Sequence, residues 1–226
     1  YVMHHNTPVS TATHPSAQDL TAANATLTGD VTIGSGTAAD RKIVFDGNAQ
    51  DYHVGLDDSA DSLIIGKGSA LGTTSHIVTD ENGHVTMPLQ SAFLAEFTTE
   101  NSNISINTNV HLYFDVERFD INADYASNTF TAPVTGTYAF FSQTRFDYID
   151  IDAAYYYYNL VTSNRTVLLD IIDPDGLDSD PIFWTLQGST LVDMDAGDTA
   201  KIHVTQSGGS AQTDAVTGNF SGYLVA

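Results

Sequence analysis

The sequence predicts an all-β protein in which a β-sandwich or jelly roll, residues 89–226, follows a segment of short strands, residues 29–88. Apolar stretches alternate with turn residues at short spacing, and we find no helical period. Aspartate supplies all but four of the 28 acidic residues, and it favours turns over helix interiors. Together these observations favour strands joined by many loops.

Residues 1–28 form a polar stretch rich in Thr, Ala and Ser, which predicts an extended N-terminal arm or linker. His4, His5 and His14 lie in it. Histidines in such a polar arm are more often solvated than bound to metal.

Residues 29–88 contain short alternating stretches separated by turns, and we expect strands at 31–33, 43–45, 52–54, 63–65, 77–79 and 85–87. Strands of this length do not build a free-standing core, so we expect a shaft or collar intertwined in a trimer. An ordinary small sheet domain is the alternative. In the trimer, the residues expected to face other chains are Ile33, Val44, Leu56, Ile64, Ile65 and Val85.

The strands lengthen in residues 89–226, where the aromatic residues gather. We expect strands at 93–98, 104–106, 110–115, 129–132, 136–146, 155–161, 166–172, 183–191, 199–205 and 218–225. Within the stretch FTAPVTGTYAFF, Pro133 and Gly136 predict a corner between two strands. The aromatic residues expected in the core are Phe130, Tyr138, Phe140 and Tyr223.

The phrase from Asn128 to Phe140, NTFTAPVTGTYAF, resembles the hallmark of the C1q-like family, whose fold is that of tumour necrosis factor. Asn128-Thr129 stands where the family usually has Thr-Gly. Two later phrases keep the family's order: Ala196-Gly197-Asp198 after Leu191, and the closing FSGYLV, which begins at Phe220. The resemblance covers residues 89–226 and implies a jelly-roll head that assembles as a homotrimer.

Residues 29–88 in turn resemble repeats in the virion fibres of tailed bacteriophages. The phrases that carry this likeness are LTGDVTIGSG, KIVFDGN, DYHVGLDDSADSLIIGKGS and TDENGHVTMP. They share Gly-Asp turns and Ile/Val strands with such shafts.

The formal charge of −21 argues against a nucleic-acid partner, because there is no basic stripe to neutralise phosphates. The sequence contains no cysteine, which excludes disulfides and thiolate sites. No apolar run approaches the roughly 20 residues that cross a bilayer, so membrane insertion is not expected.

These features predict a non-enzymatic structural protein of a virion, a phage fibre segment whose knob serves host attachment or virion assembly. Its expected partners are itself, other virion proteins and a host surface receptor or glycan. A secreted or cell-surface adhesive C1q-like protein is the alternative, although no collagen-like triplets adjoin the head. A glycan-cleaving spike enzyme is less favoured, because no nucleophile–base motif is present.

The acidic run from Asp170 to Asp180 surrounds a Pro-Asp-Gly turn and suggests a calcium site. The candidate ligands are Asp173, Asp175, Asp178 and Asp180. Asp147, Asp150 and Asp152 form a second acidic group before the tyrosine-rich strand. A solvated acidic loop is the alternative interpretation of the first group, and no other cofactor is expected.

Overall fold

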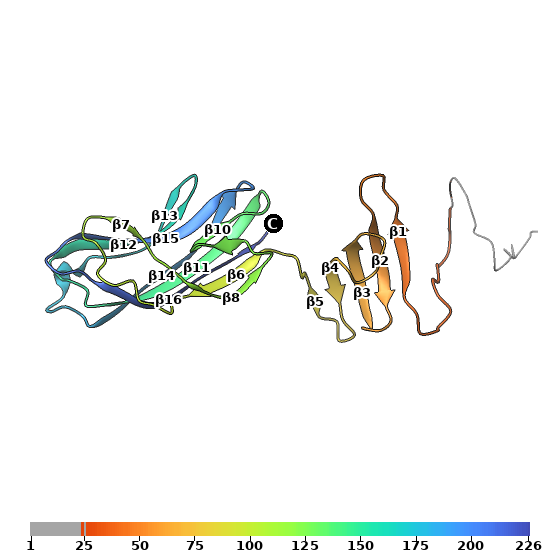
Figure 1. The fold of residues 1–226 in the computed structure, drawn as a ribbon, viewed down its shortest axis with the longest axis horizontal. Helices are drawn as coiled ribbons and strands as arrows, with labels where there is room; N and C mark the ends of the chain where they lie inside the picture. The colour runs from red at the N-terminus through yellow and green to blue at the C-terminus, as the bar shows by residue number, and fades with distance from the viewer. Residues whose placement is uncertain (1–23, 25) are drawn as a thin grey trace, which may run out of the picture. The chain divides into compact units, whose positions relative to one another are not determined.

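The computed structural model describes residue 24 and residues 26–226. Residues 39–226 contain every strand of this described part, in one small sheet and one two-sheet sandwich (Figure 1). Most of the predicted arm, residues 1–28, lies outside the described residues. Among those described, no helix has the length and hydropathy of a bilayer-spanning segment.

The small sheet is antiparallel, and its five strands follow one another in chain order. They are β1 (Arg41–Phe45), β2 (Tyr52–Asp57), β3 (Ser62–Lys67), β4 (Ser75–Thr79) and β5 (Val85–Thr86). The stretch predicted as a strand at 31–33 is not one, and Ile33 is exposed.

Carboxylates shape the turns of this sheet. Asp57 accepts hydrogen bonds from the backbone N–H groups of Ser59 and Ala60, and Asp80 accepts from those of Asn82 and His84. Such short-range bonds stabilise turns. The acidic run at 57–61 is therefore a β2–β3 turn, as its composition indicates.

The sandwich is a jelly roll of two antiparallel sheets, as predicted. One has the order β13-β12-β15-β10-β9, with β7 also paired to β15, and the other has the order β14-β11-β16-β6-β8. The bounds of the strands are β6 (Ala92–Glu96), β7 (Asn109–His111), β8 (Val116–Ile121), β9 (Tyr125–Ala126), β10 (Thr129–Thr131), β11 (Gly136–Asp147), β12 (Ala153–Thr162), β13 (Thr166–Ile172), β14 (Phe183–Met194), β15 (Thr199–Gly208) and β16 (Asp214–Leu224). A single 3-10 turn, η1 (Pro174–Gly176), follows β13.

The predicted corner between Pro133 and Gly136 is confirmed, because β10 and β11 belong to different sheets. The hydroxyl of Tyr138 donates to the carbonyl of Val134 at 2.7 Å and fixes the corner. A side chain on Gly136 would meet the carbonyl oxygen of Ala226 at 2.6 Å. The glycine therefore lets the chain end pass close to the corner.

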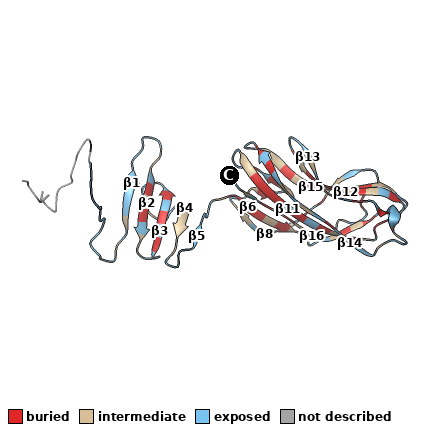
Figure 2. Ribbon diagram, turned by 180° about the vertical axis from the view of Figure 1, so that it is seen from behind, coloured by how far each residue is buried: buried red, intermediate tan, exposed pale blue. Residues whose placement is uncertain are grey.

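Aromatic side chains fill the space between the two sheets. Phe93 stacks against Phe130 at 5.1 Å and meets Phe220 edge-on at 5.0 Å. Phe130, Tyr138 and Phe140 are at most 1% exposed, as predicted. Rings at such spacings add to the stabilisation that burial provides. Figure 2 shows the buried positions alternating along the strands of both sheets.

The burial predicted for Tyr223 is wrong, because its side chain is 46% exposed. Phe220 and Gly222 of β16 face the core, and Tyr223 lies beside Gly222 on the other face. Residues 104–106 are also not a strand. Asn103 and Asn107 flank them with φ values of 56° and 58°, in the left-handed region that ends a strand.

Candidate functional site

The outward face of the β14-β11-β16-β6-β8 sheet carries large apolar side chains. Side chains alternate between the two faces of a strand, so the residues beside the core positions point outward. Residues directly opposite each other on paired strands share a face: Leu191 and Tyr223 both lie opposite Ala139, and Leu94 lies opposite Phe119. We call this cluster of outward-facing apolar side chains the open face. It consists of Leu94, Phe119, Phe141, Leu191 and Tyr223.

Four of these five side chains are 43–63% exposed, and the rings of Phe141 and Tyr223 stack at 6.1 Å. Exposed apolar residues are ordinary when single. A contiguous group on one sheet is typical of a surface that another protein covers.

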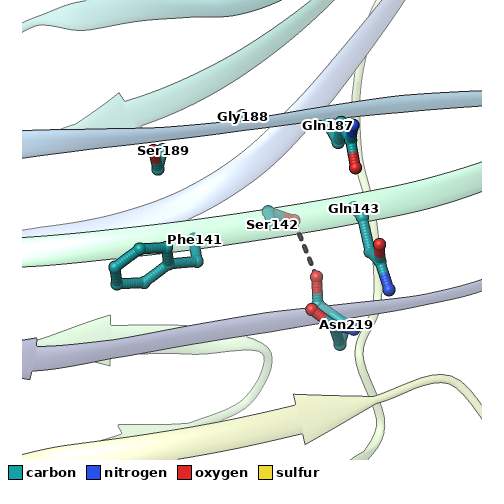
Figure 3. A pocket seen from close by; sticks show the side chains of 7 residues that line it. All are labelled: Phe141, Ser142, Gln143, Gln187, Gly188, Ser189 and Asn219. Atoms are coloured by element: carbon teal, nitrogen blue, oxygen red, sulfur yellow. Dashed lines mark hydrogen bonds between the residues drawn. The ribbon is translucent and has the colours of Figure 1, made fainter.

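The same face becomes polar further along the strands, where a hollow of about 420 Å³ lies over β11 and β14 (Figure 3). Beneath it, the hydroxyl of Ser142 donates to the backbone carbonyl of Asn219 at 2.8 Å. A second hollow, of about 360 Å³, shares Gln143 and Asn219 with the first and reaches Arg145. Side-chain amides and hydroxyls line these hollows. Such groups can form hydrogen bonds with a partner at the polar rim of an interface.

Ion pairs border this polar region. Arg145 donates to Asp147 at 2.9 Å on β11, and Arg118 of β8 donates to Glu96 of β6 at 2.6 Å. Neighbouring carboxylates thus balance both cations. These two ion pairs leave the polar region of this face close to neutral.

Two histidines lie side by side on the other sheet. His111 of β7 is directly opposite His203 of β15, and their rings stack at 5.3 Å. Burial, followed by the charges of His111 and Lys201, lowers the pKa of His203 to about 4. Burial also lowers the pKa of His111, whose ring nitrogen Nε2 lies 3.0 Å from the carbonyl oxygen of Asn128. Both rings are therefore neutral at pH 7.

The second acidic group serves the structure of the loops. Asp150 is 2% exposed and accepts hydrogen bonds from the N–H groups of Asp152, Ser210 and Ala211. Burial alone would raise the pKa of Asp150, but these donors together hold it below its ordinary value. The group thus fixes the β15–β16 connection, while Asp147 pairs with Arg145.

The four predicted calcium ligands lie exposed: Asp173 directly before η1, Asp175 in it, and Asp178 and Asp180 after it. Asp173 accepts from the N–H of Asp175 at the start of η1, and Asp180 accepts from the N–H of Ile151. In residues 24 and 26–226, no three acidic or histidine side chains converge as metal ligands. Calcium binding by Asp173, Asp175, Asp178 and Asp180 stays a prediction.

The sequence predicted Phe140 in the core correctly and Tyr223 in the core wrongly, and it assigned no role to Phe141, so the open face was missed. The adjacent residues Phe140 and Phe141 already indicate in the sequence that one large aromatic side chain must point away from the core. Two consecutive residues of a strand point to opposite faces, so only one of the two rings reaches the core.

Comparison with known proteins gives one family: the family model of the C1q domain matches residues 92–225. C1q domains are typically non-enzymatic, and C1q and TNF domains typically form trimers. No curated protein sequence matches the chain.

Several solved structures are similar to this chain. The globular domain of zebrafish complement 1qA is 18% identical, with a TM-score of 0.45 over 61% of this chain and 98% of that one. Murine APRIL is 11% identical, with a TM-score of 0.43 over 60% of this chain and 99% of that one. The PRD1 vertex protein P5 is 11% identical, with a TM-score of 0.44 over 61% of this chain and 99% of that one.

Proposed function

This chain belongs to the C1q domain family, and from that premise we propose that it is a homotrimeric structural protein of a virion. In this proposal it is a fibre segment of a tailed bacteriophage. Its head, residues 89–226, attaches to a host surface receptor or glycan, or to another virion protein.

The observation that carries the trimer is the open face. Phe141, Leu191 and Tyr223 are 43–63% exposed in a single chain, beside a polar and near-neutral region. Burial of such side chains against other chains removes apolar area from water, at about 25 cal/mol per Å². A near-neutral face also lets copies of a chain with a charge of −21 approach one another at this point.

The virion setting is supported by residues 29–88. Their sequence phrases resemble phage fibre repeats, and they form a sheet of strands only two to six residues long. A sheet of short strands that precedes a larger head in the sequence is consistent with a shaft and knob. The proposed location is therefore the virion, an extracellular particle.

The trimer is tested by sizing two variants of the full chain beside the wild type. Phe141→Asp places a charge on the open face, and three such charges near one axis should reduce the trimer to monomers. Tyr113→Asp is the matched control, because it adds the same charge at a residue that is 55% exposed but follows β7, a strand of the other sheet. A trimer mass for Phe141→Asp would contradict the assignment of the open face as the trimer interface.

The virion setting is tested by the genes beside this one. We expect genes for tail or neck proteins. A secretion signal and collagen-like repeats encoded upstream would contradict the virion and favour a secreted adhesive protein of the same family.

Calcium is proposed for the loop around η1, on the ligand chemistry of Asp173, Asp175, Asp178 and Asp180 alone. Calorimetric titration with CaCl₂ tests it. Binding that is lost in Asp175→Asn would support the site, and the absence of binding heat at millimolar calcium would contradict it.

A further inference from the structure

The small sheet β1–β5 has one face that is strongly apolar. Its register aligns Ile43, Val54, Ile65 and Ile77 in one row across four strands. Phe45 lies opposite Tyr52, and Leu56 opposite Leu63. We call this the apolar face of the small sheet; it consists of Ile43, Phe45, Tyr52, Val54, Leu56, Leu63, Ile65, Ile77 and Val85.

The opposite face is already covered by the chain itself. His53 is fully buried there, Ile64 is 4% exposed, and residues 68–74 lie over them. A side chain on Gly55 would meet Leu71 at 2.7 Å, and one on Gly66 would meet the carbonyl oxygen of Thr74 at 2.7 Å. These two glycines let the covering loop come close.

This assignment corrects the expectation for the small sheet. The sequence predicts that Ile64 faces other chains, but Ile64 is buried within its own chain beneath the loop 68–74. Val44 lies opposite His53 and therefore also points to the covered face. Leu56, Ile65 and Val85 do belong to the apolar face.

The apolar face remains accessible to solvent in the single chain. Ile43, Phe45, Tyr52, Leu56, Leu63, Ile65 and Val85 are between 39% and 60% exposed, and Figure 2 shows β1 as largely exposed. Seven large side chains at this exposure amount to several hundred Å² of apolar surface, about the upper limit for a monomeric protein.

We propose that this face packs against the same face of two further copies of the chain, so that three small sheets share one apolar core. This inference rests on the trimer proposed for the head. It adds a second contact surface, with the chain itself as the partner.

The distribution of charge favours another copy as the partner. The acidic residues between the start of β1 and the end of β5, residues 41–86, lie in turns or at strand ends, at Asp46, Asp51, Asp57, Asp58, Asp61, Asp80 and Glu81. None belongs to the apolar face, where the charged residues are two cations at its borders: Arg41 opposite Leu56 and Lys67 opposite Tyr52. Copies of this acidic chain can therefore join face to face without bringing carboxylates into direct contact.

The area also favours copies that are already tethered. Free partners that associate stably bury about 800 Å² each, which is more than this face offers. Chains held together by their heads meet at an effective concentration in the millimolar range, where a smaller contact is sufficient. The small sheets are therefore expected to associate through this face after the heads have formed a trimer.

Single cysteines provide the test, because the sequence has none. Leu63→Cys places a thiol on the apolar face, and Ala60→Cys places one on the exposed turn before β3. Each full-length variant is sized by light scattering, and its maleimide labelling rate is compared with that of the same chain in urea.

We expect both variants to be trimers. The Ala60→Cys thiol should react at nearly its rate in urea, and the Leu63→Cys thiol at least tenfold more slowly. Ile43→Cys, on the neighbouring strand, repeats the test at a second position of the face.

Equal labelling of Leu63→Cys and Ala60→Cys in a trimeric sample would overturn this inference and leave the head trimer intact. A monomer mass for both variants would instead contradict the trimer of the proposed function and the shared core with it.

Discussion

Phe140 and Phe141 are neighbours in sequence with opposite surroundings. Phe140 is 1% exposed within the aromatic core, and Phe141 is 43% exposed on the open face. Replacing Phe140 with alanine should lower the free energy of unfolding by about 3–5 kcal/mol, through lost burial and a residual cavity. Urea unfolding at a fixed protein concentration measures this. A loss below about 1 kcal/mol would contradict the assigned core position.

His203 should make the protein sensitive to mild acid. Its pKa is about 4 in the folded chain and near the ordinary value of 6.5 in the unfolded chain. The unfolded state therefore binds more protons between these values, and stability should fall as pH drops from about 6.5 to 4.

Urea unfolding at pH 7.5 and pH 5.0 measures the effect. His203→Gln removes this titrating group and should lose less stability than the wild type between the two pH values. His84→Gln is a control, since His84 is exposed and pairs only with Asp80. Equal pH dependence in the wild type and His203→Gln would contradict the role of His203.

At the scale of elements, β16 depends on small residues where it packs on the core. A side chain on Gly222 would meet the ring of Phe140 at 2.6 Å. Gly222→Ala should therefore destabilise the head by about 1–3 kcal/mol, as overpacking does. A methyl group on Gly176 in η1 would meet no atom within 4 Å, so Gly176→Ala is the matched control. Thermal unfolding of both variants measures the difference, and equal midpoints would contradict the close packing at β16.

Much of the architecture could be predicted from local pattern. Alternating apolar residues located β11, the run of four consecutive tyrosines located β12, and Pro133 with Gly136 located the corner between the sheets. The alternation of Tyr138 with Phe140 also placed Phe140, and not Phe141, in the core correctly. Tyr223 was misassigned because a shift of one residue exchanges the two faces of a strand, and the face of each β16 residue depends on the register with β11.

The short strands show the same limit. Short alternating stretches separated by turn residues located the strands β1 to β5, but the burial of Ile64 depends on the loop 68–74, which no strand pattern encodes. In the acidic run, residue spacing placed Asp173 and Asp180 in one segment. Their hydrogen bonds to backbone N–H groups depend on η1 and on the distant Ile151.

At the scale of the whole molecule, the chain combines two exposed apolar surfaces with a strongly acidic composition. A charge of −21 keeps chains apart in general. The open face and the apolar face of the small sheet each gather exposed large apolar side chains, and no carboxylate is among the residues that define them. Assembly of three copies through these surfaces would leave the acidic turns and loops in contact with solvent.

The molar mass of the wild-type chain in solution tests this account most directly. Light scattering on the full chain at micromolar concentration should give three times the mass of one chain, because both apolar surfaces are then covered. A mass equal to that of one chain would contradict the homotrimer and the function proposed from it.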